Sequence, residues 1–312
     1  MTLFKKLNNH IGWLVFLIAS FVYLSTIEQT VSFWDCGEYI ATAYKLEVGH
    51  PPGAPFFQLF GRIFSLFATQ GTSEVAVAVN ILSALCSSFT ILFLFWTITA
   101  FGKKMIFKSN IKLELGQIIA VLGSGLVGAL AYTFSDSFWF SAVEGEVYAM
   151  SSLFTAITFW CIMKWEEEAD KPQASRWLVL IAYLIGLSVG VHLLSLLTIP
   201  AMGMIYYFKK YSYTKSGAIK AFIISMAILG IVQGVIIPGA VSLISKFELF
   251  FVNTVGLPFN YGTIIYFLAI IAIIVYGLIY TKKNNKTIWN TAILSVMMLL
   301  IGYSSFAILV VR

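Results

Sequence analysis

The chain is poor in charged residues. Only 11% of its 312 residues are Asp, Glu, Lys or Arg, whereas a soluble domain carries about 25%. Hydrophobic residues make up 59%, which is more apolar surface than a water-soluble core of this size could bury. The bilayer is therefore the expected solvent, in which backbone polar groups must be satisfied by helices or a closed barrel. The apolar runs are long and lack the alternation of barrel strands, so they favour helices.

Several motifs of soluble enzymes are also missing. The three cysteines, Cys36, Cys86 and Cys161, form no Cys-x-x-Cys pair and indicate no disulfide framework. The sequence has no Gly-rich phosphate loop, no metal-spaced His/Cys cluster and no Ser/His/Asp signature, so ATP-driven chemistry lacks its usual parts. The net charge of +6 does not indicate nucleic acid, because the lysines form short clusters between apolar runs, as in cytoplasmic loops.

The apolar runs predict an all-α, polytopic transmembrane helical bundle of about nine segments. The expected segments are 11–27, 75–101, 115–134, 143–163, 177–190, 193–208, 218–244, 262–280 and 288–311. The stretch 177–208 is too long for one span and short for two. Two spans with a turn near residues 190–192 are preferred, because they place the lysines at 209–220 on the same side as the other lysine clusters.

Charge asymmetry predicts the orientation. With a cytoplasmic N-terminus, 16 of the 20 Lys and Arg residues fall inside, and the outer side receives only Lys45, Arg62, Lys246 and Arg312. Most acidic residues, with His50 and His192, fall outside. The first segment follows Lys5-Lys6 but lacks a clear cleavage site, so an uncleaved anchor is favoured over a signal peptide. The chain ends as its last segment finishes, which suggests a single transmembrane domain, residues 1–312, cut from a longer polypeptide.

The first outer loop, residues 28–74, is long and rich in polar motifs. Within it, residues 56–68 are too few to span a bilayer. Their polar positions recur at three-to-four spacing on an otherwise aromatic rod, which predicts a helix lying in the membrane interface. These positions are Gln58, Gly61, Arg62 and Ser65.

The same loop carries a pair of acids in the sequence Phe-Trp-Asp-Cys-Gly-Glu-Tyr at residues 33–39. If this segment is helical, Asp35 and Glu38 share a face. A carboxylate near the interface can act as a general base on a hydroxyl group. The alternative is a solvated loop acid beside an interfacial tryptophan.

His50 begins a stiff segment, because Pro51 and Pro52 forbid a helix there. The backbone places His50 beside the loop of Asp35. A rigid lead into the interfacial helix is an alternative interpretation, and both can hold together.

A second acidic motif, Glu144-Gly145-Glu146-Val147-Tyr148, opens the fourth segment. Acids near the start of an apolar helix must face water, a partner or a site. Helix capping is an equally weighted alternative. If this segment is helical, Glu144 shares a face with Tyr148 and not with Glu146.

His192 lies at the outer turn between the two short segments, where a packing histidine is the commoner case.

An anionic phosphate at the outer interface would need one of the few basic residues there. Lys246 can equally be a simple helix end.

These motifs resemble the GT-C superfamily of membrane glycosyltransferases that use lipid-phosphate sugars. They are most similar to the bacterial branch related to protein O-mannosyltransferases. The resemblance covers essentially the whole chain and is carried by Asp35 in Trp-Asp-x-x-Glu-Tyr, by His50-Pro51-Pro52, by the motif at residues 144–148, and by the turn at residues 186–194. Family members usually have more spans and often a soluble outer domain, so a truncated chain need not be active alone.

The resemblance implies an inverting glycosyltransferase of the bacterial inner membrane. A sugar, mannose being favoured, would arrive on polyprenyl phosphate and move to a hydroxyl group of a secreted or envelope protein, expected to be Ser or Thr. Asp35 is the implied base, with Glu38 in the same catalytic motif. The acceptor, or a divalent metal, is assigned to Glu144, Glu146 and Tyr148. The donor phosphate or sugar is assigned to His50, Arg62, Lys45, His192 and Arg312. Protein O-mannosyltransferases do not generally need a metal, so no cofactor is assigned and a divalent cation stays open.

Two other classes of protein remain as alternatives. A transporter or channel would place ionisable residues near mid-membrane, whereas the predicted span centres are nearly free of them and no inverted repeat is evident. A non-catalytic envelope scaffold would have no cavity joining Asp35, Glu144 and His192.

Overall fold

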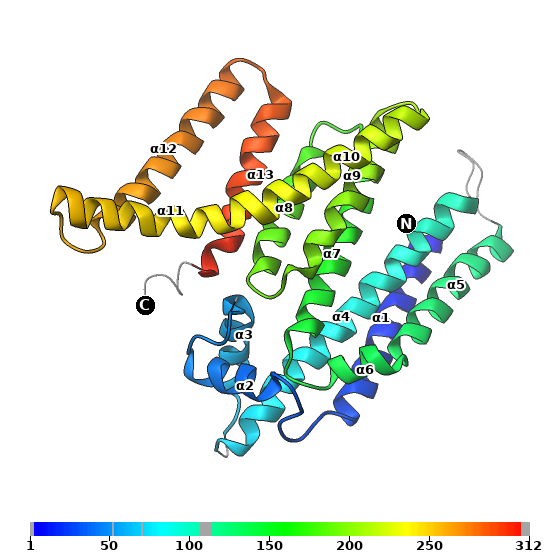
Figure 1. Cartoon of the computed structure of the whole chain (residues 1–312). Coiled ribbons are helices and arrows are strands. Elements are labelled where there is room, and N and C mark those ends of the chain that lie inside the picture. Colours follow the sequence, from blue (N-terminus) through cyan, green and yellow to red (C-terminus); the bar gives the residue numbers. More distant parts are fainter. Residues whose placement is uncertain (1–2, 52, 70, 107–113, 307–312) are drawn as a thin grey trace. The chain divides into compact units, whose positions relative to one another are not determined.

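The protein is described by a computed structural model that covers residues 3–51, 53–69, 71–106 and 114–306. It is 82% helical without strands in the described residues. Seven helices there are long and apolar enough to cross a membrane. The predicted all-α polytopic architecture is therefore confirmed (Figure 1).

Each of the nine predicted segments contains a helix, although residues 26–27, 134, 143–146 and 190 lie outside the helices. They correspond to α1 (Leu3–Ser25), α4 (Ser73–Ile106), α5 (Leu115–Thr133), α7 (Val147–Glu168), α8 (Ser175–Val189), α9 (Thr198–Lys210), α10 to α11 (Lys215–Ile231 and Ile237–Phe250), α12 (Tyr261–Lys283) and α13 (Thr287–Tyr303). The short pair α8 and α9 is joined by a turn and a 3-10 helix, Leu193–Leu197. Two π-helical turns, Val232–Ile236 and Phe251–Val255, extend α10 and α11 into one stretch of 41 residues.

Three further helices, α2 (Cys36–Lys45), α3 (Pro55–Ser65) and α6 (Asp136–Ala142), lie between the long ones. Local chemistry fixes several helix ends. Pro55 occupies the first turn of α3, where a missing N–H costs nothing. Glu114 and Gln117 form a capping box at the start of α5, and the Thr214 hydroxyl accepts from the Gly217 N–H at the start of α10.

The chain divides into two compact units, one of residues 1–163 with 190–195 and one of residues 164–189 with 196–312. In the first unit, α1, α4 and α5 pack side by side (Figure 1). Gly12 lies against Trp96, and Gly125 lies against Thr99 and Phe95, at distances that leave no room for a Cβ atom. A small residue at each crossing makes room for large side chains of the neighbouring helix, as is usual in membranes.

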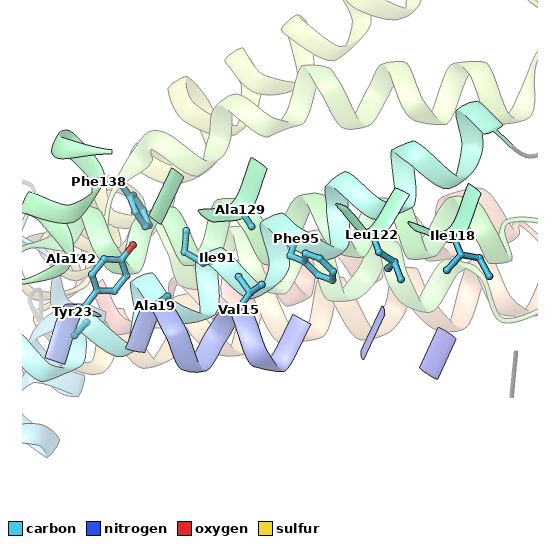
Figure 2. Close-up of a cluster of buried hydrophobic side chains, with 11 residues drawn as sticks. Val15, Ala19, Tyr23, Ile91, Phe95, Ile118, Leu122, Ala129, Phe138 and Ala142 are labelled. Carbon is cyan, nitrogen blue, oxygen red and sulfur yellow. The ribbon is translucent and has the colours of Figure 1, made fainter. Parts of the chain in front are cut away.

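Figure 2 shows the apolar cluster between these helices and α6. Its fully buried members include Val15, Ala19, Tyr23, Ile91, Phe95, Ala129 and Ala142. The Tyr23 hydroxyl donates to the Thr133 carbonyl at 3.0 Å, so its polar atom is satisfied inside the cluster. This core holds the end of α1, and therefore the start of the first loop, in a defined place.

In the second unit, α8 and α13 cross with backbone contact. Gly186 lies against the Leu299 carbonyl, and Gly302 lies against the Tyr183 carbonyl and the Leu187 amide. The Lys210 Nζ atom donates to the Ala169 carbonyl at 2.7 Å. These contacts tie the helices of this unit to one another.

The helix α3 carries the predicted polar stripe, but the stripe faces protein. Gln58 and Ser65 are buried, and the Gln58 Nε2 atom donates to the Thr42 hydroxyl of α2 at 3.3 Å. Gly61 lies so close to Ala43 that a Cβ atom there would come within 2.7 Å. The opposite face exposes Phe60 and Ile63, and Leu66 and Phe67, directly after the helix, are exposed as well.

Candidate functional site

The start of the first loop is tied to α4 and to the segment before α7. The Glu28 N–H donates to the Val143 carbonyl at 3.1 Å. The buried Asn80 side chain of α4 donates to the carbonyls of Glu28 at 2.7 Å and Thr30 at 3.2 Å. The first loop is therefore held against α4 by the Asn80 side chain and against the segment before α7 by a backbone hydrogen bond.

Asp35 sits at the N-cap of α2, directly after a strained residue. Trp34 has φ 65° and is 89% exposed. A bulky L-residue in this left-handed conformation costs roughly 1–2 kcal/mol, and such strain clusters at functional sites. Glu38 follows in the first turn of α2, on the face of Asp35, as the sequence predicted.

His50 lies between these two carboxylates. Its backbone N–H donates to Glu38 Oε1, and its Nδ1 atom lies 3.0 Å from Glu38 Oε2. Its Nε2 atom lies 3.8 Å from Asp35 Oδ2. The hydrogen bonds with Glu38 raise the pKa of His50, and they lower the pKa of the Glu38 carboxyl. The structure thus brings together the three residues that the first-loop motifs singled out.

The two glutamates of the second motif have different surroundings. Neither is helical, because α7 begins only at Val147. Glu144 accepts a hydrogen bond from the Ser32 hydroxyl at 2.5 Å and so ties the first loop to this segment. Gly145 is packed against Asn80, where a Cβ atom would come within 2.9 Å of the amide oxygen.

Glu146 faces the first-loop cluster. It is only 5% exposed, and its Oε2 atom accepts a hydrogen bond from its neighbour, the Val147 N–H, at 3.3 Å. Burial raises the pKa of Glu146 to about 7, with further contributions from the charges of Glu144 and Asp35, while His50 acts in the opposite direction. The Glu146 carboxyl group is therefore partly protonated near neutral pH.

Tyr39 belongs to the same cluster, although it was assigned no role from its motif alone. Its ring lies 5.8 Å from that of His50. Burial raises the pKa of Tyr39 to about 12, and the charges of Glu146 and Asp35 add to this shift. The phenol therefore stays protonated and can donate a hydrogen bond. Its position one turn after Asp35 was the signal available in the sequence.

The turn at residues 190–192 joins the same part of the first unit. The Phe56 N–H at the start of α3 donates to the Gly190 carbonyl at 2.8 Å. The His192 ring lies 5.5 Å from the Tyr148 ring. The Leu194 N–H donates to His192 Nδ1 at 3.1 Å, and burial lowers the pKa of His192. A neutral imidazole with its hydrogen on Nε2 satisfies both observations.

The basic residues of the first loop have other contacts. Lys45 lies 4.0 Å from a Glu47 carboxylate oxygen. The Arg62 guanidinium lies 5.2 Å from the centre of the Tyr44 ring. Arg312 lies outside the described residues. In the described part of the chain, no ion pair joins Lys45 or Arg62 to Asp35, Glu38, Glu144 or Glu146.

The described residues also contain one group with the spacing of a cation site. Asp35, Glu38 and His50 can each offer one atom, and these atoms lie within 4.8 Å of one another. All three are exposed and interact with one another. The other assignment of a divalent metal, to Glu144, Glu146 and Tyr148, stays a prediction.

The chain is similar to known proteins over a region that includes this site. A family model described as the protein O-mannosyl-transferase TMEM260 N-terminal domain matches residues 35–215, more than half of the chain. The protein O-mannosyl-transferase tmem260 of Dictyostelium discoideum is 28% identical over 197 residues, which are 60% of this chain and 22% of that protein. The protein O-mannosyl-transferase TMEM260 of Mus musculus is 25% identical over 175 residues, which are 56% of this chain and 22% of that protein. The chain thus spans about a fifth of the length of these relatives. No solved structure matches it.

Proposed function

The chain belongs to the family of the protein O-mannosyl-transferase TMEM260 N-terminal domain, and from this premise we propose that it is the membrane part of a protein glycosyltransferase. The donor is a sugar, with mannose favoured, on polyprenyl phosphate. The acceptor is a Ser or Thr hydroxyl group of a secreted or envelope protein. The reaction takes place on the outer face of the membrane, and the N-terminus is cytoplasmic. A bacterial inner membrane and a GT-C-type fold belong to the same proposal.

The observation that carries the proposal is the meeting of two distant acidic motifs. Asp35 and Glu146 are separated by more than a hundred residues, yet they interact electrostatically with each other and with His50. The family match begins at residue 35 and includes both motifs. Titratable groups with perturbed pKa values, here Glu146 and His50, are typical of a catalytic site.

In the proposed reaction, Asp35 accepts the proton of the acceptor hydroxyl group. The oxygen attacks the anomeric carbon, a new C–O bond forms, and the bond from that carbon to the lipid phosphate oxygen breaks. The configuration inverts in this single displacement, and the polyprenyl phosphate leaves with the bonding electrons. General-base assistance of this kind contributes roughly 10²–10⁴-fold in rate.

Other residues have supporting roles in this proposal. Glu146 in its protonated form and the Tyr39 and Tyr148 hydroxyl groups can hydrogen-bond the acceptor or the sugar. His192 can donate from Nε2. The leaving phosphate needs cationic stabilisation, and Arg62 is better suited than Lys45 because its only described polar contact from the guanidinium is a 3.4 Å hydrogen bond to the Ser65 hydroxyl. Arg312 remains a further option for the phosphate.

Glu144 is better explained as a structural residue. Its hydrogen bond with Ser32 fixes the first loop against the segment before α7. In this account Glu144 holds the first loop in the position needed for the reaction and does not itself contact the substrate.

The experiment that tests the proposal is transfer by the purified full-length protein in proteoliposomes. The donor is polyprenyl-phosphate mannose and the acceptor is a Ser/Thr peptide. We expect labelled sugar on the peptide, and none when a nucleotide sugar replaces the lipid donor. Absence of transfer, with movement of the donor or an ion across the bilayer instead, would support the transporter alternative and contradict the proposal.

A further inference from the structure

Glu38 holds His50 at two points. One carboxylate oxygen accepts from the His50 backbone N–H, and the other lies 3.0 Å from Nδ1 of the same residue. The two residues are twelve positions apart, so the contact closes the segment between α2 and the Pro51 turn. A ring held through its backbone and its Nδ1 atom has a fixed orientation.

The orientation directs the other ring nitrogen at Asp35. His50 Nε2 lies 3.8 Å from Asp35 Oδ2, which is within ion-pair distance. Asp35 and Glu38 are both set by the first turn of α2, one as the N-cap and one three residues later. The imidazole ring therefore lies between two carboxylates whose backbone positions are fixed by one short helix.

We infer that Glu38 and His50 form a positioning clamp, in which the imidazolium held by Glu38 turns one oxygen of Asp35 toward Nε2 and leaves the other oxygen for the acceptor hydroxyl. This inference rests on the proposed role of Asp35 as the base. Glu38 and His50 are positioning residues in this account, since they act on the substrate through Asp35.

The charges around His50 support an imidazolium. Asp35 and Glu38 face it from α2, and the buried Glu146 acts on it from the segment before α7. The neutral Tyr39 ring covers one side. In the described residues no Lys or Arg forms an ion pair with these three carboxylates. Without the imidazolium, the Asp35 and Glu38 carboxylates would lie close together with no described cation between them.

The clamp predicts how sugar transfer depends on pH. The hydrogen bond with Glu38 raises the pKa of His50, so the imidazolium persists above the usual range and is lost as the pH rises through the raised pKa. Sugar transfer should fall on this alkaline side. Removal of the Glu38 charge should move the fall to lower pH, whereas a merely structural role of Glu38 would leave its position unchanged.

The test measures kcat and the donor KM against pH for the full-length protein in proteoliposomes. Glu38→Gln should move the alkaline fall to lower pH with little change in donor KM. His50→Ala should lower kcat by about tenfold or more, as expected when a reacting group is misplaced, and added imidazole should restore part of it. The matched controls, Glu47→Gln and His10→Gln, change an exposed acid and an exposed histidine outside the clamp and should match the wild type.

Two outcomes separate the clamp from the proposal on which it rests. If Asp35→Asn abolishes transfer while Glu38→Gln and His50→Ala keep the wild-type pH profile and kcat, the clamp is overturned and the base is retained. If Asp35→Asn transfers sugar normally, the assignment of Asp35 as the general base is wrong. Glu38→Asp, which keeps the charge but shortens its reach, covers the case in which Glu38→Gln misfolds. It should lower kcat without the shift in pH, and an unchanged kcat would overturn the clamp.

Discussion

The buried carboxyl of Glu146 makes the stability of the protein depend on pH. Burial raises its pKa from 4.5 to about 7 in the folded protein. Below pH 4.5 the group is protonated whether the chain is folded or not, so it has no effect there. As the pH rises toward 7 the unfolded chain ionises first, and the folded state loses stability. The loss is complete above the folded pKa.

The size of this effect follows from the two pKa values. The difference between 4.5 and about 7, at roughly 1.4 kcal/mol for each pKa unit, corresponds to about 3 kcal/mol. Glu146→Gln keeps the shape of the protonated side chain and cannot ionise. The variant should therefore match the wild type near pH 4.5 and exceed its free energy of unfolding by up to about 3 kcal/mol at pH 8.

The assay is reversible unfolding of the purified protein in detergent micelles across this pH range. Glu47→Gln is the matched control, since Glu47 is exposed and its removal should leave the pH dependence unchanged. If Glu146→Gln were no more stable than the wild type at pH 8, the carboxyl would not be buried as described, and its place beside Asp35 would be refuted.

Two further predictions concern packing and sidedness. Gly145→Val should lower the free energy of unfolding by about 1–3 kcal/mol, because a Cβ atom at Gly145 would come within 2.9 Å of Asn80 and 3.0 Å of Ile40; a thermal shift equal to that of wild type would contradict the close packing of the glutamate motif. Because the N-terminus is proposed to be cytoplasmic, Val48→Cys should react with a membrane-impermeant maleimide in intact cells, and Asn285→Cys only after permeabilisation. The three native cysteines are buried and should add little background labelling. The reverse pattern would overturn the orientation.

The long helices were predictable because their signals are strong. Apolar runs of membrane length located the seven helices that can cross a membrane, and the positions of the lysines located the break between the shorter helices α8 and α9 near Gly190. The short helix α6 carries too few residues for a periodic signal, and its seven residues pack as part of the apolar cluster.

The candidate site was predictable only in part. The shared face of Asp35 and Glu38 followed from helical spacing. The different surroundings of Glu144 and Glu146 did not, because their segment is not helical and Glu144 is set by a tertiary hydrogen bond with Ser32. For α3, periodicity gave the polar stripe around Gln58, but only packing against α2 shows which way it faces.

The most direct test of the central claim is the turnover of Asp35→Asn in the full-length protein. Donor binding and peptide binding are measured separately, so that a loss of kcat reports the chemical step. With Asp35 as the base, kcat should fall by roughly 10²–10⁴-fold while both affinities stay near those of the wild type. A variant that transfers sugar at the wild-type rate would contradict the account.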